Sequence, residues 1–268
     1  MKLLSSDLDI ERFFHSLERS AHCILIIDYD GTLAPFRERR GEAEPYPGVR
    51  RSIDLIMERN GSRVVMVSGR SAGDVRPLLG FRKPPEIWGC HGWERMMPDG
   101  SHDLPAIDER YRRGIREALD RAGAEGFAPR CETKTASVAF HWRGLAPASI
   151  HSAREKIERE WRKIADRNGM LLGDFDGGIE LRVPGRNKGT AVNTILDDAP
   201  PGAVTAYLGD DRTDEDAFSA LKGRGLSVLV NESFHPTAAD LWLIPPRELL
   251  EFLARWGAAR GGDGGFFH

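Results

Sequence analysis

The sequence is poor in cysteine, with only Cys23, Cys90 and Cys131 among 268 residues. They lie far apart, form no Cys-x-x-Cys pair and cannot all pair within one chain, which argues against a disulfide framework and a thiolate zinc site. Such usage is typical of a reducing compartment, and we expect a cytoplasmic protein. No run approaches the roughly 20 apolar residues that span a bilayer, and acidic residues interrupt the N-terminal segment early. We therefore expect no signal peptide and no membrane contact.

An excess of charge of either sign is also absent. Lys and Arg number 38 and Asp and Glu 41, which gives a formal net charge of −3. Proteins that coat nucleic acid carry a surplus of basic residues, and this sequence has no basic stripe with interleaved aromatics, so we expect no nucleic-acid partner. The composition is that of a folded chain long enough for one large domain or two modest ones. Nothing in it points to an obligate protein partner.

Short apolar runs rich in β-branched residues recur along the chain. They lack the polar alternation of half-exposed strands, which predicts strands buried on both faces, as in a parallel sheet. Helix-period segments lie between them, so we expect an α/β fold with a doubly wound parallel-sheet, Rossmann-like core. The predicted strands are 24–27, 64–67, 87–88, 204–208 and 226–230, and the predicted helices are 47–60, 188–196 and 214–221.

Residues 104–183 show a different pattern. Two units of helix followed by strand succeed one another there, which predicts an inserted α+β cap domain. The predicted helices are 108–122 and 149–167, and the predicted strands are 137–142 and 179–183. The catalytic core would then comprise residues 1–103 and 184–268.

Two carboxylates, Asp28 and Asp30, directly follow an apolar run. The carboxyl ends of strands are where open α/β sheets bind ligands, although a solvated turn of Asp and Gly is the alternative. A second apolar run leads into five carboxylates between Asp210 and Asp216. Converging carboxylates would raise one another's pKa, and Mg²⁺ bound by two or three of them resolves this conflict.

Basic and hydroxyl groups occur at the same predicted edge. Ser68, Gly69 and Arg70 end another predicted strand, and such a combination at a helix start can hold a phosphate. The alternative is that Ser68 is a plain N-cap. Lys188 begins a predicted helix, where the dipole favours an acid, so a cation at this position hints at an anionic ligand. The alternative is an ordinary exposed lysine.

In order along the chain, these segments resemble the four motifs of the haloacid dehalogenase-like phosphohydrolases. The motifs are Asp28-Tyr-Asp-Gly-Thr-Leu, Ser68-Gly-Arg, Lys188 and Gly209-Asp-Asp-x-Thr-Asp. Finer features resemble the trehalose-6-phosphate phosphatase family of that superfamily. They are Gly89-x-His-Gly-x-Glu, Glu132-x-Lys-x-x-Ser, His141-x-Arg, Gly178-Ile-Glu-Leu-Arg and Asn187-Lys-Gly.

The resemblance implies a Mg²⁺-dependent phosphatase that hydrolyses trehalose 6-phosphate to trehalose and phosphate, a step of trehalose biosynthesis. Asp28 would be the nucleophile that forms an aspartyl-phosphate, and Asp30 the general acid and then the base. Ser68, Gly69 and Lys188 would bind the phosphoryl group. The implied metal ligands are Asp28, the backbone carbonyl of Asp30, Asp210 and Asp214, the last of which would support a bound water or Lys188.

Sugar selection is implied for the cap, whose polar side chains offer donors and acceptors to hydroxyl groups. The candidates are Glu132, Lys134, His141, Arg143 and Glu180. The alternative for each is an exposed strand position, and for His141 a structural histidine. Trp161, on an amphipathic helix, is expected to pack in the cap, and His91 to line the entrance between the domains. Thr133 and Trp142 depart from the family's usual Asn or Asp and usual Tyr.

Other functions stay open at this point. The same motifs fit a phosphatase for another sugar phosphate, such as mannosyl-3-phosphoglycerate or sucrose 6-phosphate, and a phosphosugar mutase. A non-catalytic module that binds a sugar phosphate is a further alternative. The full set of acids, Ser68 and Lys188 argues against it, because a module without catalysis could lose any of them.

Overall fold

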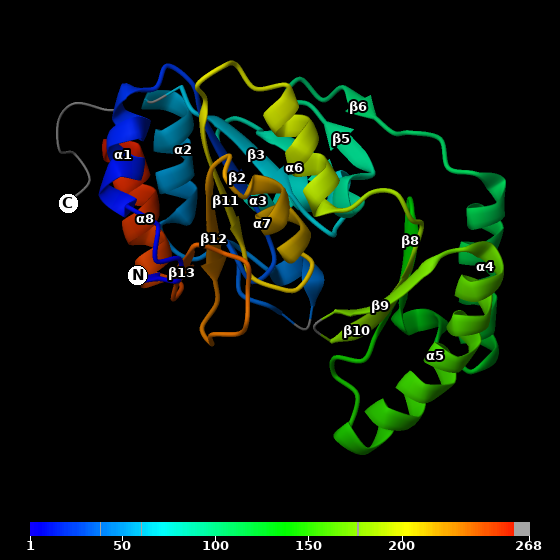
Figure 1. Ribbon diagram of the computed structural model, residues 1–268. Coiled ribbons are helices and arrows are strands. Elements are labelled where there is room, and N and C mark those ends of the chain that lie inside the picture. The colour runs from blue at the N-terminus through cyan, green and yellow to red at the C-terminus, as the bar shows by residue number, and fades with distance from the viewer. Residues whose placement is uncertain (38, 60, 176, 260–268) are drawn as a thin grey trace. The chain divides into compact units, whose positions relative to one another are not determined.

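A computed structural model describes residues 1–37, 39–59, 61–175 and 177–259 (Figure 1). The chain divides into two compact units. Residues 1–103 and the chain from 187 onward form the core unit, and residues 104–186 form the cap unit, so that the second boundary lies three residues beyond the predicted 183. Among the described residues, no helix is both long enough and apolar enough to cross a membrane.

The core unit is built on a nine-stranded sheet in the order β1-β13-β12-β11-β2-β3-β4-β5-β6. The pairs from β13 to β4 are parallel, whereas β1, β5 and β6 add antiparallel edges. The predicted α/β class is thereby confirmed. The strands are β1 (Lys2–Leu3), β2 (Cys23–Ile27), β3 (Arg63–Val67), β4 (Glu86–Gly89), β5 (Glu94–Met96), β6 (His102–Asp103), β11 (Val204–Gly209), β12 (Leu226–Val230) and β13 (Leu241–Leu243).

Helices cover both faces of this sheet. Alternate residues of β2 point to opposite sides: Leu25 and Ile27 join one apolar cluster, and Ile24 and Ile26 join the other. This explains why the run lacks polar alternation. The first cluster includes residues of α1 (Ile10–Arg19), α2 (Val49–Arg59), α3 (Ala72–Leu79) and α8 (Arg247–Ala258), and the second includes residues of α6 (Lys188–Asp197) and α7 (Glu215–Leu221) (Figure 1).

The cap unit is a four-stranded antiparallel sheet with two helices. The strand order is β7-β8-β10-β9. Each helix is followed by a hairpin, so the prediction of one strand after each helix was incomplete. The elements are α4 (Glu109–Ala124), the 3₁₀ helix η3 (Ala128–Arg130), β7 (Cys131–Lys134), β8 (Ser137–His141), α5 (Pro147–Asn168), β9 (Leu171–Phe175) and β10 (Gly178–Arg182). The core unit also contains two short 3₁₀ helices, η1 (Arg40–Glu42) and η2 (Cys90–Gly92).

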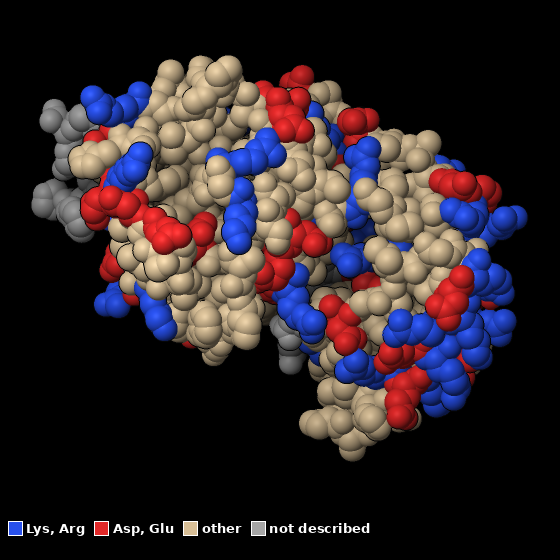
Figure 2. All heavy atoms as spheres, in the orientation of Figure 1, with Lys and Arg blue, Asp and Glu red and all other residues tan. Residues whose placement is uncertain are grey.

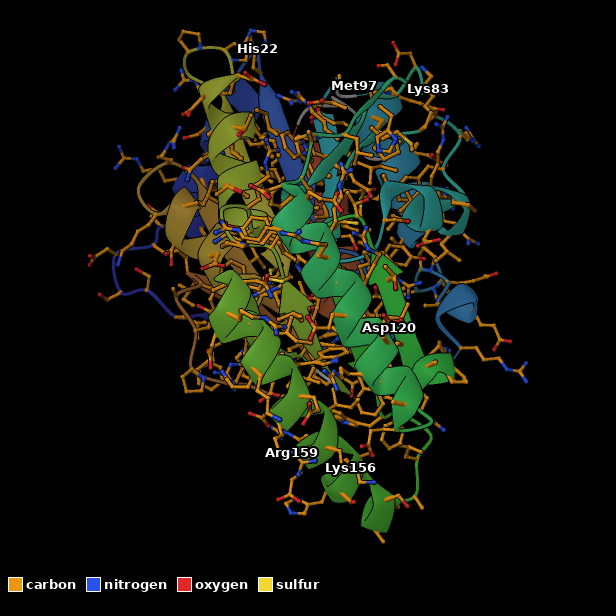
Figure 3. All side chains as sticks on the ribbon, turned by 90° about the vertical axis from the view of Figure 1, so that its right-hand side faces the viewer. His22, Lys83, Met97, Asp120, Lys156 and Arg159 are labelled. Carbon is orange, nitrogen blue, oxygen red and sulfur yellow. The ribbon has the colours of Figure 1, made fainter. Side chains whose placement is uncertain are left out.

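Trp161 connects the two cap helices, as expected for a packing residue. Its side chain is fully buried in α5, and its indole Nε1 donates to the carbonyl of Ala118 in α4 at 2.9 Å. Figure 3 views α4 and α5 from their outer side, with Asp120 and Arg159 labelled. Both of these side chains are exposed. The helices therefore present one charged side to water and one apolar side to the cap interior.

Charge on the surface is mixed in sign. On the face drawn in Figure 2, Lys and Arg lie among Asp and Glu. Ion pairs occur along α5, for example between Arg162 and Glu158 at 2.9 Å. Among the described residues of that face, no continuous basic stripe is visible.

Replacing Trp161 tests whether the cap depends on this contact. Trp161→Ala would leave a large void and remove the donor to the Ala118 carbonyl, so we expect the free energy of unfolding to fall by about 3–5 kcal/mol. Urea denaturation measures it. Arg159→Ala, on the exposed side of the same helix, is the control and should change stability by no more than about 0.5 kcal/mol. Equal stability of the two variants would contradict the packing role.

Candidate active site

The predicted site residues converge at the carboxyl edge of the core sheet. Asp28 and Asp210 directly follow β2 and β11, which are parallel neighbours with Leu208 opposite Ile27. The amide of Asp28 donates to the carbonyl of Leu208 at 2.9 Å, which fixes the two loops side by side. Ser68 follows β3, the strand on the other side of β2. Three segments far apart in the sequence therefore meet at one edge, as parallel topology requires.

Lys188 lies at the centre of this arrangement. Its Nζ donates to Oδ1 of Asp28 at 2.9 Å and to Oδ1 of Asp214 at 2.8 Å, and all three residues are buried. Burial alone lowers the pKa of Lys188, but the charges of Asp214 and Asp28 outweigh burial and raise that pKa well above its usual range. The lysine is therefore held as a cation at the start of α6, where the helix dipole opposes it. Its carboxylate partners offset that opposition.

The carboxylates at this edge form a cluster that suits a hard cation. Oxygens of Asp28, Asp210 and Asp214 lie within 4.8 Å of one another. Burial raises the pKa of Asp28 to about 8; Lys188 opposes the rise and Asp214 adds to it. Burial, and then the charges of Asp211 and Asp28, raise the pKa of Asp210 well above its usual range. The single positive charge of Lys188 does not balance the three carboxylates if all of them are ionised. A small dication that prefers oxygen ligands fits this donor set.

A glycine makes room for this cluster. A Cβ on Gly31, whose φ is +81°, would lie 2.0 Å from Oδ2 of Asp210 and 2.9 Å from the ring of Phe36. Both the left-handed backbone and the close approach exclude a larger residue there. Gly31 is the residue after Asp30, so the turn of the first motif needs it for the carboxylate of the fourth motif to fit.

Asp214 is held by four donors. Its Oδ1 accepts from Lys188 and from the hydroxyl of Tyr207 at 2.5 Å, and its Oδ2 accepts from the amides of Asp210 and Asp211 at 3.1 and 3.2 Å. With these contacts the carboxylate fixes Lys188 and the loop that carries Asp210. Sequence reasoning missed Tyr207. The signal was a tyrosine inside an apolar strand, since a buried hydroxyl needs a partner.

Asp30 forms an ion pair with Arg70. Nε and Nη2 of the guanidinium donate to the two carboxylate oxygens at 2.6 and 2.5 Å. Burial opposes a rise in the pKa of Arg70, but the hydrogen bonds and charge of Asp30 raise it. The sequence analysis placed Arg70 in the second motif but did not predict that its side chain would pair with Asp30.

The alternative in which Ser68 is an N-cap is wrong. Helix α3 begins at Ala72, and its N-cap is Ser71. The hydroxyl oxygen of Ser68 instead accepts a hydrogen bond from the amide of Arg70 at 3.1 Å.

His91 lies within the core unit, buried against Gly69, where a Cβ on the glycine would be 2.7 Å from the imidazole Cε1. Its place at the entrance between the domains stays a prediction. The backbone of His91 also donates to the carbonyl of Ser68 at 3.0 Å. The residue therefore contacts the loop of the second motif.

In the cap unit, most of the predicted sugar-binding residues share one polar face of the sheet. Lys134 and Ser137 both donate to Oε1 of Glu180, at 2.9 and 2.7 Å, and His141 Nε2 lies 3.0 Å from Oε2 of Glu132. Val138 and Phe140 alternate with them and are buried. Ser137 is an additional member of this face that was not among the candidates.

Arg143 lies just beyond β8, which ends at His141. A Cβ on Gly177 would lie 2.5 Å from its Cγ and Nε, so the stem of the side chain crosses that glycine. Its carbonyl accepts from Arg130 at 3.1 Å. Arg143 is therefore placed beside the strand ends of the cap sheet.

Comparisons with known proteins agree with these motifs. The family model described as trehalose-phosphatase matches residues 26–241. A trehalose-phosphate phosphatase of Mycobacterium avium is 31% identical over 252 residues, 87% of this chain and 62% of the relative. An uncharacterized glycosyl hydrolase of Mycobacterium tuberculosis is 30% identical over 246 residues, 86% of this chain but 18% of the relative. The chain thus spans less than two thirds of the length of these relatives.

Solved structures share the fold. The C-terminal domain of trehalose-6-phosphate phosphatase from C. albicans has a TM-score of 0.79 at 20% identity, over 96% of this chain and 99% of that one. A trehalose-6-phosphate phosphatase related protein has a TM-score of 0.68 at 26% identity, over 86% and 95%. Because the family model covers most of the sequence, including the residues that meet at the sheet edge, this chain belongs to the trehalose-phosphatase family.

Proposed function

We propose that this chain is a Mg²⁺-dependent phosphatase that hydrolyses trehalose 6-phosphate to trehalose and phosphate through an aspartyl-phosphate. The observation that supports it most is the buried ion pair of Lys188 with Asp28 and Asp214 beside Asp210. Membership of the trehalose-phosphatase family supports the substrate class. The cytoplasmic location stays a prediction.

The metal would be held by Asp28, Asp210 and the backbone carbonyl of Asp30. Bound Mg²⁺ would neutralise charge on the phosphate dianion, which otherwise repels an anionic nucleophile. Asp214 is the least available of the three clustered carboxylates, since four donors already engage it. We assign it to the support of Lys188 and of the metal-binding loop.

Asp28 is the proposed nucleophile. Attack of a carboxylate oxygen on phosphorus forms the acyl-phosphate bond while the bond from phosphorus to the sugar oxygen breaks. Lys188 contacts Asp28 directly, so its charge also stabilises the transferring phosphoryl group. Ser68 and Gly69, at the end of the neighbouring strand, would bind phosphoryl oxygens through the hydroxyl and the amide.

Asp30 is the proposed proton donor to the sugar oxygen and, in the second step, the base that activates water. Arg70 holds both of its carboxylate oxygens in the described structure. Donation of a proton therefore requires that at least one of these hydrogen bonds be exchanged. Arg70 orients the carboxylate between the two steps.

The polar face of the cap sheet is proposed to recognise the sugar. Glu180, held by Lys134 and Ser137, and Glu132, held by His141, present acceptors whose orientation is already fixed. Fixed acceptors discriminate strongly between hydroxyl patterns, because a wrong ligand leaves them without partners.

Substitution of the two catalytic acids tests the order of events. Asp28→Asn should lower kcat by about a thousandfold or more and give no acid-stable phosphoenzyme, because the attacking oxygen is lost. Asp30→Asn should slow both formation and breakdown of the phosphoenzyme in single-turnover experiments. Circular dichroism checks that both variants fold. Substantial turnover by Asp28→Asn would refute the nucleophile assignment, and a pure KM effect in Asp30→Asn would refute the double role.

Metal binding can be measured without turnover. Mg²⁺ should raise the melting temperature of the chelator-treated protein, by an amount equivalent to about 2.7 kcal/mol at a hundred times Kd. Asp210→Asn should remove most of this stabilisation. Asp216→Asn is the matched control, since Asp216 lies exposed on α7 in the same acidic segment. A stabilisation that survives Asp210→Asn, or is lost in the control, would exclude the proposed ligand set.

A panel of sugar phosphates tests the substrate. Trehalose 6-phosphate should be hydrolysed with a higher kcat/KM than glucose 6-phosphate, sucrose 6-phosphate or mannosyl-3-phosphoglycerate. Glu180→Gln should lower kcat/KM for trehalose 6-phosphate by about tenfold or more, since it breaks a charged hydrogen-bond set, and leave p-nitrophenyl phosphate hydrolysis unchanged. Equal activity on all sugars would reject the sugar assignment and keep the phosphatase, while conversion of one sugar phosphate into another would indicate a mutase.

A further inference from the structure

We propose that His91 is a positioning residue for the phosphate-binding loop Ser68–Arg70. The inference rests on the proposed phosphatase function and extends it to a residue on the next strand connection, η2. Its basis is a left-handed loop that places the imidazole on Gly69 and links the second motif to the start of α6.

The backbone of η2 is unusual for residues with side chains. Cys90 and His91 have φ angles of 49° and 56°, and Gly92 follows at 94°. Left-handed angles are uncommon outside glycine, although histidine is among the residues that adopt them more often. A glycine at position 91 would form the same turn without strain. The turn itself therefore gives no reason for an imidazole, and its reason must lie in what the side chain contacts.

The contacts of this loop are with the second motif. The amide of Cys90 donates to the carbonyl of Arg70 at 2.7 Å, and the amide of His91 donates to the carbonyl of Ser68 at 3.0 Å. Between these two hydrogen bonds the imidazole covers Gly69 so closely that a Cβ there would lie 2.7 Å from Cε1 and 2.9 Å from Nε2. The ring therefore restricts the peptide that would bind a phosphoryl oxygen.

The other side of the loop faces the third motif. A Cβ on Gly92 would lie 3.0 Å from the carbonyl of Asn187, the N-cap of the helix that begins with Lys188. The η2 loop therefore packs against both the second motif and the start of the helix that carries Lys188.

The base of the loop is anchored independently of the imidazole. Glu94 Oε2 accepts from the amide of Ala72 at 2.9 Å, and Oε1 accepts from the thiol of Cys90 at 3.1 Å. Both contacts, and the two backbone hydrogen bonds to Ser68 and Arg70, are made by groups other than the His91 side chain. Removal of that side chain should therefore leave the loop folded.

His91→Gly separates positioning from folding, because glycine removes the ring and also relieves the left-handed backbone. With Mg²⁺ present, the inhibition constant of inorganic phosphate and the KM for p-nitrophenyl phosphate should both rise by about tenfold, since both depend on the same loop donors. The circular dichroism spectrum at the assay temperature should be that of the wild type, because the loop is anchored by groups other than the imidazole. Unchanged phosphate affinity, or a loss of affinity accompanied by loss of the native spectrum, would overturn the inference.

Gly69→Ala completes a double-mutant cycle. Its Cβ should displace the ring or the loop and weaken phosphate binding to a similar extent, while the double variant with His91→Gly should resemble His91→Gly alone because the clash is gone. If the double variant loses phosphate affinity by the product of the two single losses, the two residues act independently, which would contradict the proposal. A wild-type protein that neither binds phosphate nor hydrolyses p-nitrophenyl phosphate would instead refute the proposed function.

Discussion

The contact of Lys188 with Asp28 and Asp214 is the interaction on which the site depends. Asp28 and Lys188 are 160 residues apart in the sequence, and the whole cap unit lies between them. Without the ammonium, the buried carboxylates of Asp28 and Asp214 would meet at one sheet edge without the positive charge that offsets their repulsion and their loss of hydration. The core can therefore complete its site only when the chain returns from the cap and begins α6. The cap insertion and the chemistry are linked through this one helix start.

The sequence was sufficient to predict the centre of the core because its physical signals there are local. The run Ile24–Ile27 has no polar alternation, and a strand buried on both faces in a parallel sheet is the simplest structure that allows this. The carboxylates after two such runs must then meet if the strands are neighbours. The edge strand β1 and its neighbour β13 could not be predicted in this way. They have two and three residues, and their positions depend on pairing with other strands, Lys2 of β1 with Trp242 and Leu241 of β13 with Val228 of β12, rather than on any local pattern.

The side-chain partners inside the site were the least predictable part. Arg70 lies 40 residues from Asp30, and only the adjacency of β2 and β3 brings them together. Tyr207 was visible in the sequence as a hydroxyl in an apolar run, but the choice of Asp214 as its acceptor follows from the turn after β11. In the cap, the first strand of each hairpin was missed because β7 and β9 are largely half-exposed. Their short, mixed sequences do not separate them from loops.

The core edge and the polar face of the cap sheet hold their acids in the same way, by hydrogen bonds from neighbouring side chains or amides. At the edge of the core sheet, acids are fixed by Lys188, Arg70 and backbone amides; on the cap sheet, Glu180 is fixed by Lys134 and Ser137, and Glu132 by His141. Each acceptor is oriented before any ligand binds, so binding or reaction loses little conformational entropy in ordering it. The difference lies in charge. The core cluster keeps an excess of carboxylate that a cation can satisfy, whereas Glu180 lies beside Lys134 and Glu132 beside His141. The cap pairs are thus suited to neutral hydroxyl groups, and the core cluster to a metal and a phosphate.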